Sequence, residues 1–203
     1  ASYLDDEAIA LMVNHGTWLV ADNYNGDYIA EIGKRDGWPA EVLRKNDETT
    51  GTQRAGFQKA VRAGVRIAYG TDSGVYPHGR NANQFRYMVR YGMTPLQAIR
   101  SATLDSARLL GHEKDIGSIA VGRSADLGAV AGDPLVDVRV LEDVRGVIQA
   151  GRVVRSEELR EPRTLSPDPS PGGRGEISAA NARNPSPAGR RWREAPDEGT
   201  ESP

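Results

Sequence analysis

The chain has 203 residues, a formal net charge of -2 from 26 basic and 28 acidic side chains, and no cysteine. This nearly balanced charge gives no reason to expect nucleic acid or an anionic membrane as a partner. The absence of cysteine excludes disulfides and thiolate metal ligands, and no apolar run approaches the length that spans a bilayer. The first residues contain neither an initiator methionine nor a signal peptide. The compartment therefore stays open, and we expect the chain to begin inside a longer protein.

The first third of the chain predicts two helices with a short strand between them. Residues 2–16 are predicted to form a helix, because Asp5 is a suitable N-cap and apolar residues recur at helical spacing. The apolar run 18–21 is long enough for one buried strand, and the polar residues 22–27 after it are typical of a loop. Helix-forming residues then dominate 40–63.

A second strand is predicted at 65–69, directly after the glycine that closes the long helix. The order helix, glycine, strand is the second half of a β-α-β unit, in which the two strands run parallel. The loop at 70–79 follows. A carboxylate at the end of a buried strand, beside glycines that let other groups approach, is where α/β enzymes place their chemistry. Asp72 is therefore the first candidate for a catalytic residue.

Two more helices are predicted beyond this loop. Residues 81–91 carry apolar side chains at helical spacing and end at a glycine. Thr94 and Gln97 form a capping box that starts a helix extending to residue 110, with a break expected at 105–106.

From residue 117 the pattern changes to short strands alone, at 117–122, 125–130 and within 146–154, which predicts a separate small β element. The remaining segment, 156–203, holds eight of the twelve prolines, and Trp192 is its only aromatic residue. It is too poor in apolar residues to offset the entropy of ordering, so we predict a disordered tail.

Four side chains in the two loops are candidates for chemistry. Asp72 is either a metal ligand and proton acceptor, or simply an N-cap or turn residue. His78 lies between proline and glycine, so it either contacts a substrate or is a solvated loop histidine. Tyr76 and Tyr24 have phenol groups that either bind a substrate carboxylate or only cover the loops.

The order of several short motifs resembles the C-terminal part of a metal-dependent amidohydrolase. The motifs are G-T-D at 70–72, T-P-L-Q-A-I at 94–99, G-S-I-A-V-G at 117–122 and A-D-L at 125–127. The loop G-V-Y-P-H-G at 74–79 is similar to the branch that contains imidazolonepropionase-like and Xaa-Pro dipeptidase-like enzymes. The resemblance covers residues 1 to about 154.

The resemblance implies an α/β fold in three parts. Residues 1–114 would form the last two strands and helices of a (β/α)8 TIM barrel, 115–155 part of a small β-sandwich, and 156–203 the tail. It implies a divalent metal, expected to be zinc, with Asp72 as a ligand that transfers a proton from the bridging hydroxide to the leaving group. The substrates would be small molecules with C–N bonds, such as dipeptides or N-acyl amino acids.

The remaining metal ligands of the family are expected upstream of this chain. Because a catalytic zinc site needs about three protein ligands, Asp72 alone cannot hold the metal. We therefore expect a C-terminal fragment of a hydrolase that is inactive alone. The alternatives are a non-enzymatic truncated product, a homo-oligomer, a chain that completes a barrel supplied by another chain, or a small binding module built on the strands of 117–154.

Overall fold

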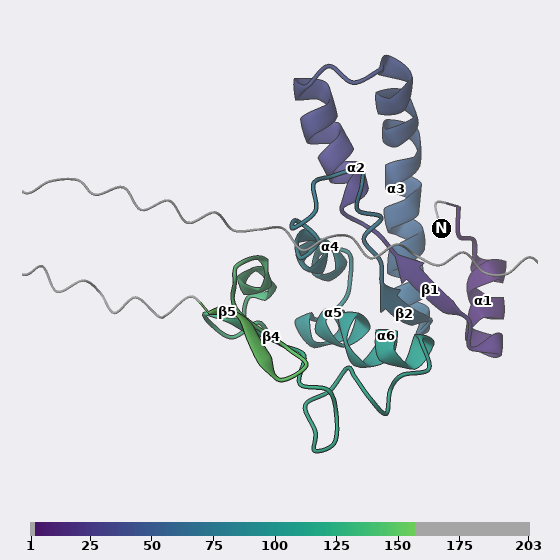
Figure 1. The fold of residues 1–203 in the computed structure, drawn as a ribbon. Coiled ribbons are helices and arrows are strands. Elements are labelled where there is room, and N and C mark those ends of the chain that lie inside the picture. The colour runs from purple at the N-terminus through teal and green to yellow at the C-terminus, as the bar shows by residue number, and fades with distance from the viewer. Residues whose placement is uncertain (1–2, 157–203) are drawn as a thin grey trace, which may run out of the picture. The chain divides into compact units, whose positions relative to one another are not determined.

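The structure is a computed structural model that describes residues 3–156, all within one unit of the chain, Ala1–Arg160 (Figure 1). The described part is a mixture of helices with two small sheets, which confirms the α/β class. Apart from Ser156, which ends the last strand, the tail predicted to be disordered lies outside the described residues.

The first helix, α1 (Asp6–His15), has the predicted cap at its start. The Asp5 side chain accepts a hydrogen bond from the backbone N–H of Ala8 at 2.8 Å, which satisfies one of the free donors of the first turn. The helix ends at Gly16, whose φ of 64° is the left-handed conformation that glycine adopts without strain. Strand β1 (Trp18–Ala21) follows, as predicted.

Strands β1 and β2 (Arg66–Tyr69) pair in parallel, with Trp18 opposite Arg66 and Ala21 opposite Tyr69. The predicted β-α-β arrangement is therefore confirmed. The connection contains α2 (Asn25–Tyr28), a π-helical segment (Ile29–Gly33) and α3 (Ala40–Ala63), which has the predicted bounds.

The predicted loop at 22–27 is wrong in its second half, because α2 begins at Asn25. Tertiary contacts with α3 outweigh the poor helix propensity of this stretch. The Asn46 side chain donates to the carbonyl of Gly26 at 3.0 Å. A Cβ at Gly26 would lie only 2.6 Å from the Thr50 side chain, so only glycine lets α2 and α3 pack this closely.

Three shorter helices follow β2: α4 (Asn83–Arg90), α5 (Pro95–Ala102) and α6 (Leu104–Leu109). The predicted capping box of Thr94 and Gln97 is confirmed, with hydrogen bonds of 3.2 and 2.8 Å. The break falls at Thr103 instead of at 105–106. Gly117 packs against the Thr103 carbonyl at this point, a contact between distant residues that sequence periodicity does not reveal.

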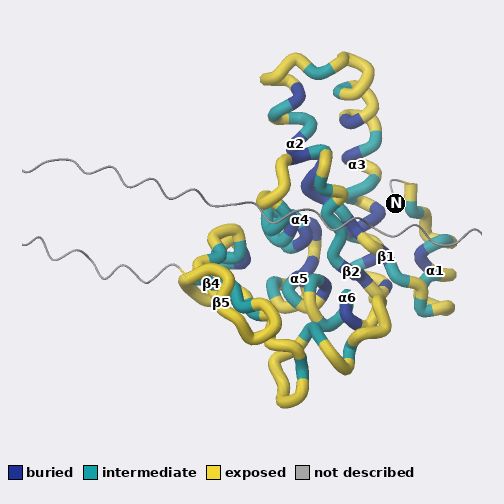
Figure 2. The backbone as a smooth tube through the Cα atoms, in the orientation of Figure 1, coloured by how far each residue is buried: buried dark blue, intermediate teal, exposed yellow. Residues whose placement is uncertain are grey.

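The main core lies between the β1–β2 sheet and the helices around it, where the buried segments gather in Figure 2. Its members are Ile9, Leu19, Ala21, Phe57, Ala60, Val65, Ile67, Met88, Tyr91, Met93 and Ala98. None of the helices within residues 3–156 is both long and apolar enough to cross a membrane.

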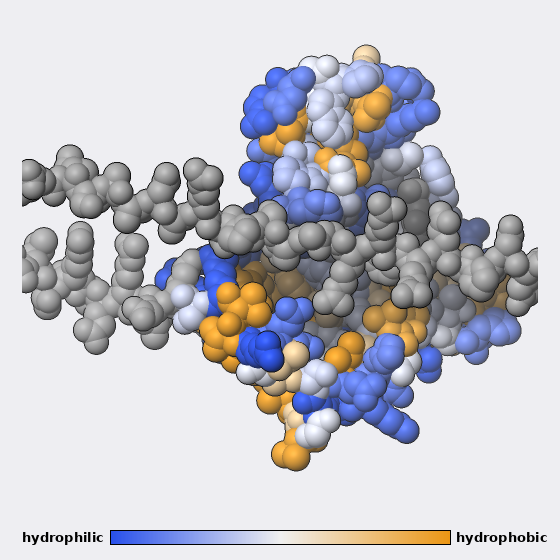
Figure 3. Space-filling model, viewed as in Figure 1, coloured by the Kyte–Doolittle hydropathy of each residue, from blue (hydrophilic) through white to orange (hydrophobic). Residues whose placement is uncertain are grey.

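The last strands form an antiparallel sheet in the order β3 (Leu127–Val130), β4 (Val144–Gln149) and β5 (Arg152–Ser156), with a short 3-10 helix (Val138–Glu142) between β3 and β4. The strand predicted at 117–122 is wrong: the segment forms turns, because no neighbouring strand pairs with it. The β4–β5 region is largely exposed, and hydrophobic surface is visible there (Figure 3).

Replacing Gly70 by alanine should destabilise the chain by about 1–3 kcal/mol. A Cβ at this position would lie 2.9 Å from the carbonyl oxygen of Ala21, a backbone atom that cannot easily move. Gly51→Ala is the matched control, because Gly51 lies inside α3 with nothing within 4 Å of the added Cβ. It should stabilise by about 0.5–1 kcal/mol. Urea unfolding gives the free energy of unfolding of each variant. Equal changes in Gly70→Ala and Gly51→Ala would contradict the prediction.

Candidate functional site

The loops that follow β1 and β2 meet through one asparagine. Asp22 comes directly after β1, and Asp72 lies three residues beyond β2. Because the strands are parallel, their carboxyl ends share one edge. The Nδ2 atom of Asn25 donates to Asp22 Oδ2 at 2.9 Å and to Asp72 Oδ2 at 3.2 Å. The sequence-predicted candidate Asp72 is thus joined by two residues that the sequence assigned only to a loop.

Asp22 is partly buried and is held in place from α3. Gln53 Nε2 donates to the Asp22 carbonyl at 2.9 Å and lies 3.4 Å from its Oδ1. Burial raises the pKa of the Asp22 carboxyl, the hydrogen bond from Asn25 opposes this, and the nearby negative charge of Asp72 raises the pKa further. Asp22 and Asp72 therefore lie close together, and both burial and the negative charge of Asp72 disfavour the ionised form of Asp22.

Gln84 fixes the backbone from which Asp22 and Asn25 project. Its side chain is fully buried on α4. Its Oε1 accepts from the backbone N–H groups of Asn23 and Tyr24, both at 2.9 Å, and its Nε2 donates to the carbonyl of Ala21 at 2.9 Å. A glutamine among the apolar positions of the predicted helix 81–91 was the signal that could have identified this residue.

Asp72 is exposed and adopts a φ of 45°, a left-handed conformation that aspartate tolerates better than most residues. His78 lies on the same loop and is also exposed, with its Nδ1 3.2 Å from the Ser73 hydroxyl. Within the described residues no hydrogen bond joins His78 to Asp72. The structure therefore keeps both candidates in one loop, but it does not bring them into direct contact.

The two predicted tyrosines lie together in a buried cluster with Tyr28. The rings of Tyr24 and Tyr76 have centroids 4.7 Å apart, and the Tyr76 hydroxyl donates to the carbonyl of Thr71 at 2.9 Å. Burial raises the pKa of Tyr76, so its phenol stays neutral at physiological pH. The cluster joins the two loops, and contact of either tyrosine with a substrate stays a prediction.

A metal ion is the cofactor that the sequence resemblance implies, and Asp72 and Asp22 both offer carboxylate oxygens. Across residues 3–156, no three or more histidine, aspartate or glutamate side chains come together as a metal site. Because a catalytic divalent site such as zinc needs about three protein ligands, the described residues alone do not fit the metal. The role of Asp72 as a metal ligand stays a prediction.

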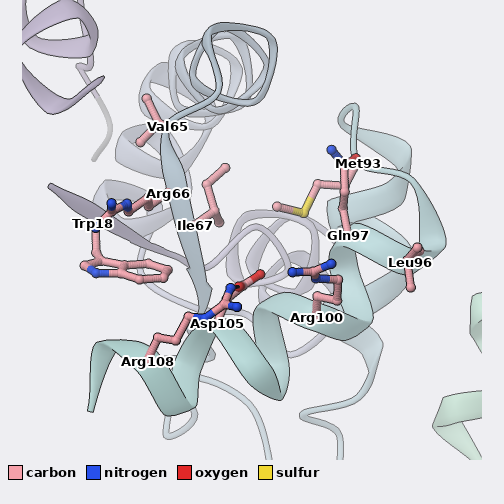
Figure 4. Close-up of a pocket in the computed structure, with 10 residues that line it drawn as sticks. All are labelled: Trp18, Val65, Arg66, Ile67, Met93, Leu96, Gln97, Arg100, Asp105 and Arg108. Atoms are coloured by element: carbon pink, nitrogen blue, oxygen red, sulfur yellow. Dashed lines mark hydrogen bonds and ion pairs between the residues drawn. The ribbon is translucent and has the colours of Figure 1, made fainter. Parts of the chain in front are cut away.

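A separate cavity of about 570 Å³ lies at the opposite ends of the strands (Figure 4). Trp18 and Arg66, which begin β1 and β2, line it together with Arg100 and the ion pair of Arg108 with Asp105 at 3.0 Å. Its charged groups are mainly cationic. The cavity is therefore distinct from the carboxylate pair.

The chain belongs to the amidohydrolase family, whose model matches residues 1–154. This confirms the resemblance noted in the sequence. The parallel strands with polar loops at their carboxyl ends agree with it, since family neighbours imply a fold of the TIM-barrel type.

Several known proteins are similar to this chain over about three quarters of its length. A crystal structure of a Xaa-Pro dipeptidase with bound methionine is 41% identical, with a TM-score of 0.72, over 77% of this chain and 39% of that chain. A prolidase complexed with N-methylphosphonate-L-proline is 31% identical, with a TM-score of 0.68, over 75% of this chain and 38% of that chain. Ochratoxinase of Aspergillus niger is 33% identical over 72% of this chain and 30% of its own length. The chain thus spans well under half of each relative.

Replacing Gln84 by leucine should loosen the backbone after β1, because this backbone is held by the hydrogen bonds of the Gln84 side chain. The N–H groups of Asn23 and Tyr24 would lose their acceptor while buried, which costs about 1–3 kcal/mol for each group. We expect amide hydrogen exchange at these two residues to accelerate at least about tenfold. Gln58→Leu is the control, because Gln58 makes no side-chain hydrogen bond in the described part of the chain. Unchanged exchange in Gln84→Leu would refute the role of Gln84.

Proposed function

We propose that this chain forms one wall of the active site of a metal-dependent hydrolase that cleaves C–N bonds in small amides or dipeptides. The observation that carries the proposal is the position of Asp72 just beyond the carboxyl end of a strand paired in parallel, in a chain of the amidohydrolase family. Relatives that are a Xaa-Pro dipeptidase and a prolidase support the choice of substrate class.

In this proposal β1 and β2 are the last two strands of a (β/α)8 barrel within residues 1–114. Each has a single strand neighbour in the described part of the chain, so each keeps a free edge for further strands. The antiparallel sheet within 115–155 would belong to a small β-sandwich. Its exposed valines, Val153 and Val154, support this, because exposed apolar side chains of a sheet become more stable when another layer covers them.

Asp72 would act as the general base and acid of the reaction. The Asn25 amide holds one oxygen of its carboxylate, which orients the group. The carboxylate would accept a proton from the attacking water and deliver it to the leaving nitrogen. A bound divalent metal, expected to be zinc, would supply Lewis-acid polarisation of the scissile carbonyl. His78, exposed on the same loop, would contact the substrate.

A chimera tests the proposed role of Asp72. Residues 1–154 would replace the matched region of the solved Xaa-Pro dipeptidase, and hydrolysis of a Xaa-Pro dipeptide would be measured with zinc present. We expect activity in the chimera and a loss of at least about 100-fold in kcat for Asp72→Asn, because general acid-base groups contribute at least that much. Asp47→Asn, an exposed carboxylate on α3, is the control and should retain activity. Equal rates in both variants would exclude Asp72 from catalysis.

The isolated 203-residue chain should be inactive with zinc, since its described residues do not gather three metal ligands. Turnover of a Xaa-Pro dipeptide above the level of Asp72→Asn would refute this.

The free strand edges also favour a second candidate, a chain that completes a barrel supplied by another chain. Size-exclusion chromatography that shows only a monomer at all concentrations, with no binding of a hydrophobic dye, would argue against that candidate.

A further inference from the structure

The side chain of Asp72 depends on a hydrogen bond for its orientation. The residue is exposed, so close packing does not fix its side chain. Among the described residues, the Asp72 carboxylate takes part in one hydrogen bond, which its Oδ2 accepts from Asn25 Nδ2 at 3.2 Å. The orientation of the Asp72 carboxylate therefore follows the orientation of the Asn25 amide.

The Asn25 amide is held in turn by Asp22. An amide NH2 group has two N–H donors in one plane, and Nδ2 of Asn25 reaches two carboxylates, Asp22 at 2.9 Å and Asp72. Rotation of the amide about its side-chain torsion would break the hydrogen bond to Asp22, which is the shorter of the two. Asp22 therefore fixes the plane from which Asn25 donates to Asp72.

This orientation of Asn25 is unfavourable in other respects. Asn25 is only 8% exposed, and its Oδ1 is buried without a hydrogen bond to any residue of 3–156. An unpaired buried oxygen destabilises a structure, and so does the burial of a carboxylate such as Asp22 beside a second negative charge. In a purely structural position, apolar side chains of similar size would avoid both costs.

The backbone that carries Asp22 and Asn25 is anchored independently of the two side chains. Gln53 donates to the backbone carbonyl of Asp22 at 2.9 Å, and Asn46 donates to the carbonyl of Gly26, beside Asn25, at 3.0 Å. Both anchors come from α3 and act on the backbone. A change of the Asp22 side chain therefore leaves them in place.

We propose that Asp22 is a positioning residue of the reaction, which acts through Asn25 to hold the Asp72 carboxylate in one orientation. This inference rests on the proposed function, in which Asp72 is the general base and acid. Oδ2 of Asp72 is engaged by Asn25, whereas Oδ1 accepts no hydrogen bond from the described residues and is the oxygen that transfers the proton. A carboxylate held in one rotamer reacts faster than a freely rotating one, because proton transfer requires a defined geometry.

Nuclear magnetic resonance of the full chain, labelled with ¹³C and ¹⁵N, tests whether Asp72 is held. The buffer contains EDTA, so that no divalent ion orients the carboxylate, and three-bond couplings to Cγ report the side-chain rotamer. We expect one rotamer for Asp72. Asp47 is the internal control and should average over rotamers, because it is exposed on α3 and makes no side-chain hydrogen bond in the described part of the chain. Averaging at Asp72 equal to that at Asp47 would overturn the inference.

Two variants test the role of Asp22 in the same measurement. Asp22→Ala removes the acceptor, so the Asp72 couplings should become averaged. Asp22→Asn is the matched control, because its amide oxygen still accepts from Asn25, and Asp72 should keep one rotamer. Averaging in both variants, or in neither, would contradict the inference. If Asp22→Ala does not fold, Asp22→Leu removes the acceptor while filling the same space.

Kinetics of the dipeptidase chimera measure the effect on the reaction. Asp22→Ala should lower kcat at least about tenfold, the usual effect of removing a group that supports a catalytic residue, and should leave KM unchanged. Asp22→Asn should retain the kcat of the unaltered chimera. A loss confined to KM would assign Asp22 to substrate binding and overturn the inference, and an equal loss of kcat in both variants would do the same.

The two measurements separate the inference from the proposed function, because the couplings are recorded without substrate and without turnover. One rotamer at Asp72 that depends on Asp22, together with an inactive chimera, would support the hold of Asp22 on Asp72 and reject the hydrolase. An active chimera in which Asp22→Ala keeps its full kcat would support the hydrolase and reject the positioning role.

Discussion

The three hydrogen bonds of the Gln84 side chain determine how β1 ends and how its loop begins. A buried glutamine on a helix is unfavourable unless its amide is fully used, and here it binds the backbone on both sides of Asp22. The Ala21 carbonyl also accepts from Gly70 N–H at 2.9 Å, so the same atom connects β1, β2 and α4. The positions of both acidic loops follow from this junction.

The junction brings two negative charges to one edge of the sheet. Parallel pairing alone would place Asp22 and Asp72 at neighbouring strand ends, and the absence of a side chain at Gly70 allows the close approach of the two backbones there. The left-handed backbone of Asp72 adds strain, which local structure at functional sites commonly stores. The Asn25 amide partly offsets the repulsion by donating to both carboxylates. The two carboxylates are therefore held together at a cost in free energy, which the Asn25 amide offsets only in part.

Local sequence signals predicted most of the helices and both parallel strands. Caps such as Asp5 and Thr94 act through neighbours within three residues, so the sequence contains their full cause. The helix at Asn25 and the break at Thr103 depend on contacts with residues far along the chain, and periodicity does not contain that information. For the same reason the sequence predicts Asp72, which follows directly from its place after a strand. Asp22, Asn25 and Gln84 join the candidate site through contacts between residues far apart in the sequence, which only the folded structure shows.

Charge is segregated along the β1–β2 sheet. Arginines surround the amino ends of the strands, where Arg66 lies over the Trp18 ring at 5.8 Å, whereas carboxylates occupy the carboxyl ends. An arginine beside Asp22 would neutralise part of this negative charge. Because amides carry no net charge, Asn25 and Gln53 fix the position of the Asp22 carboxylate by hydrogen bonds and not by ion pairs.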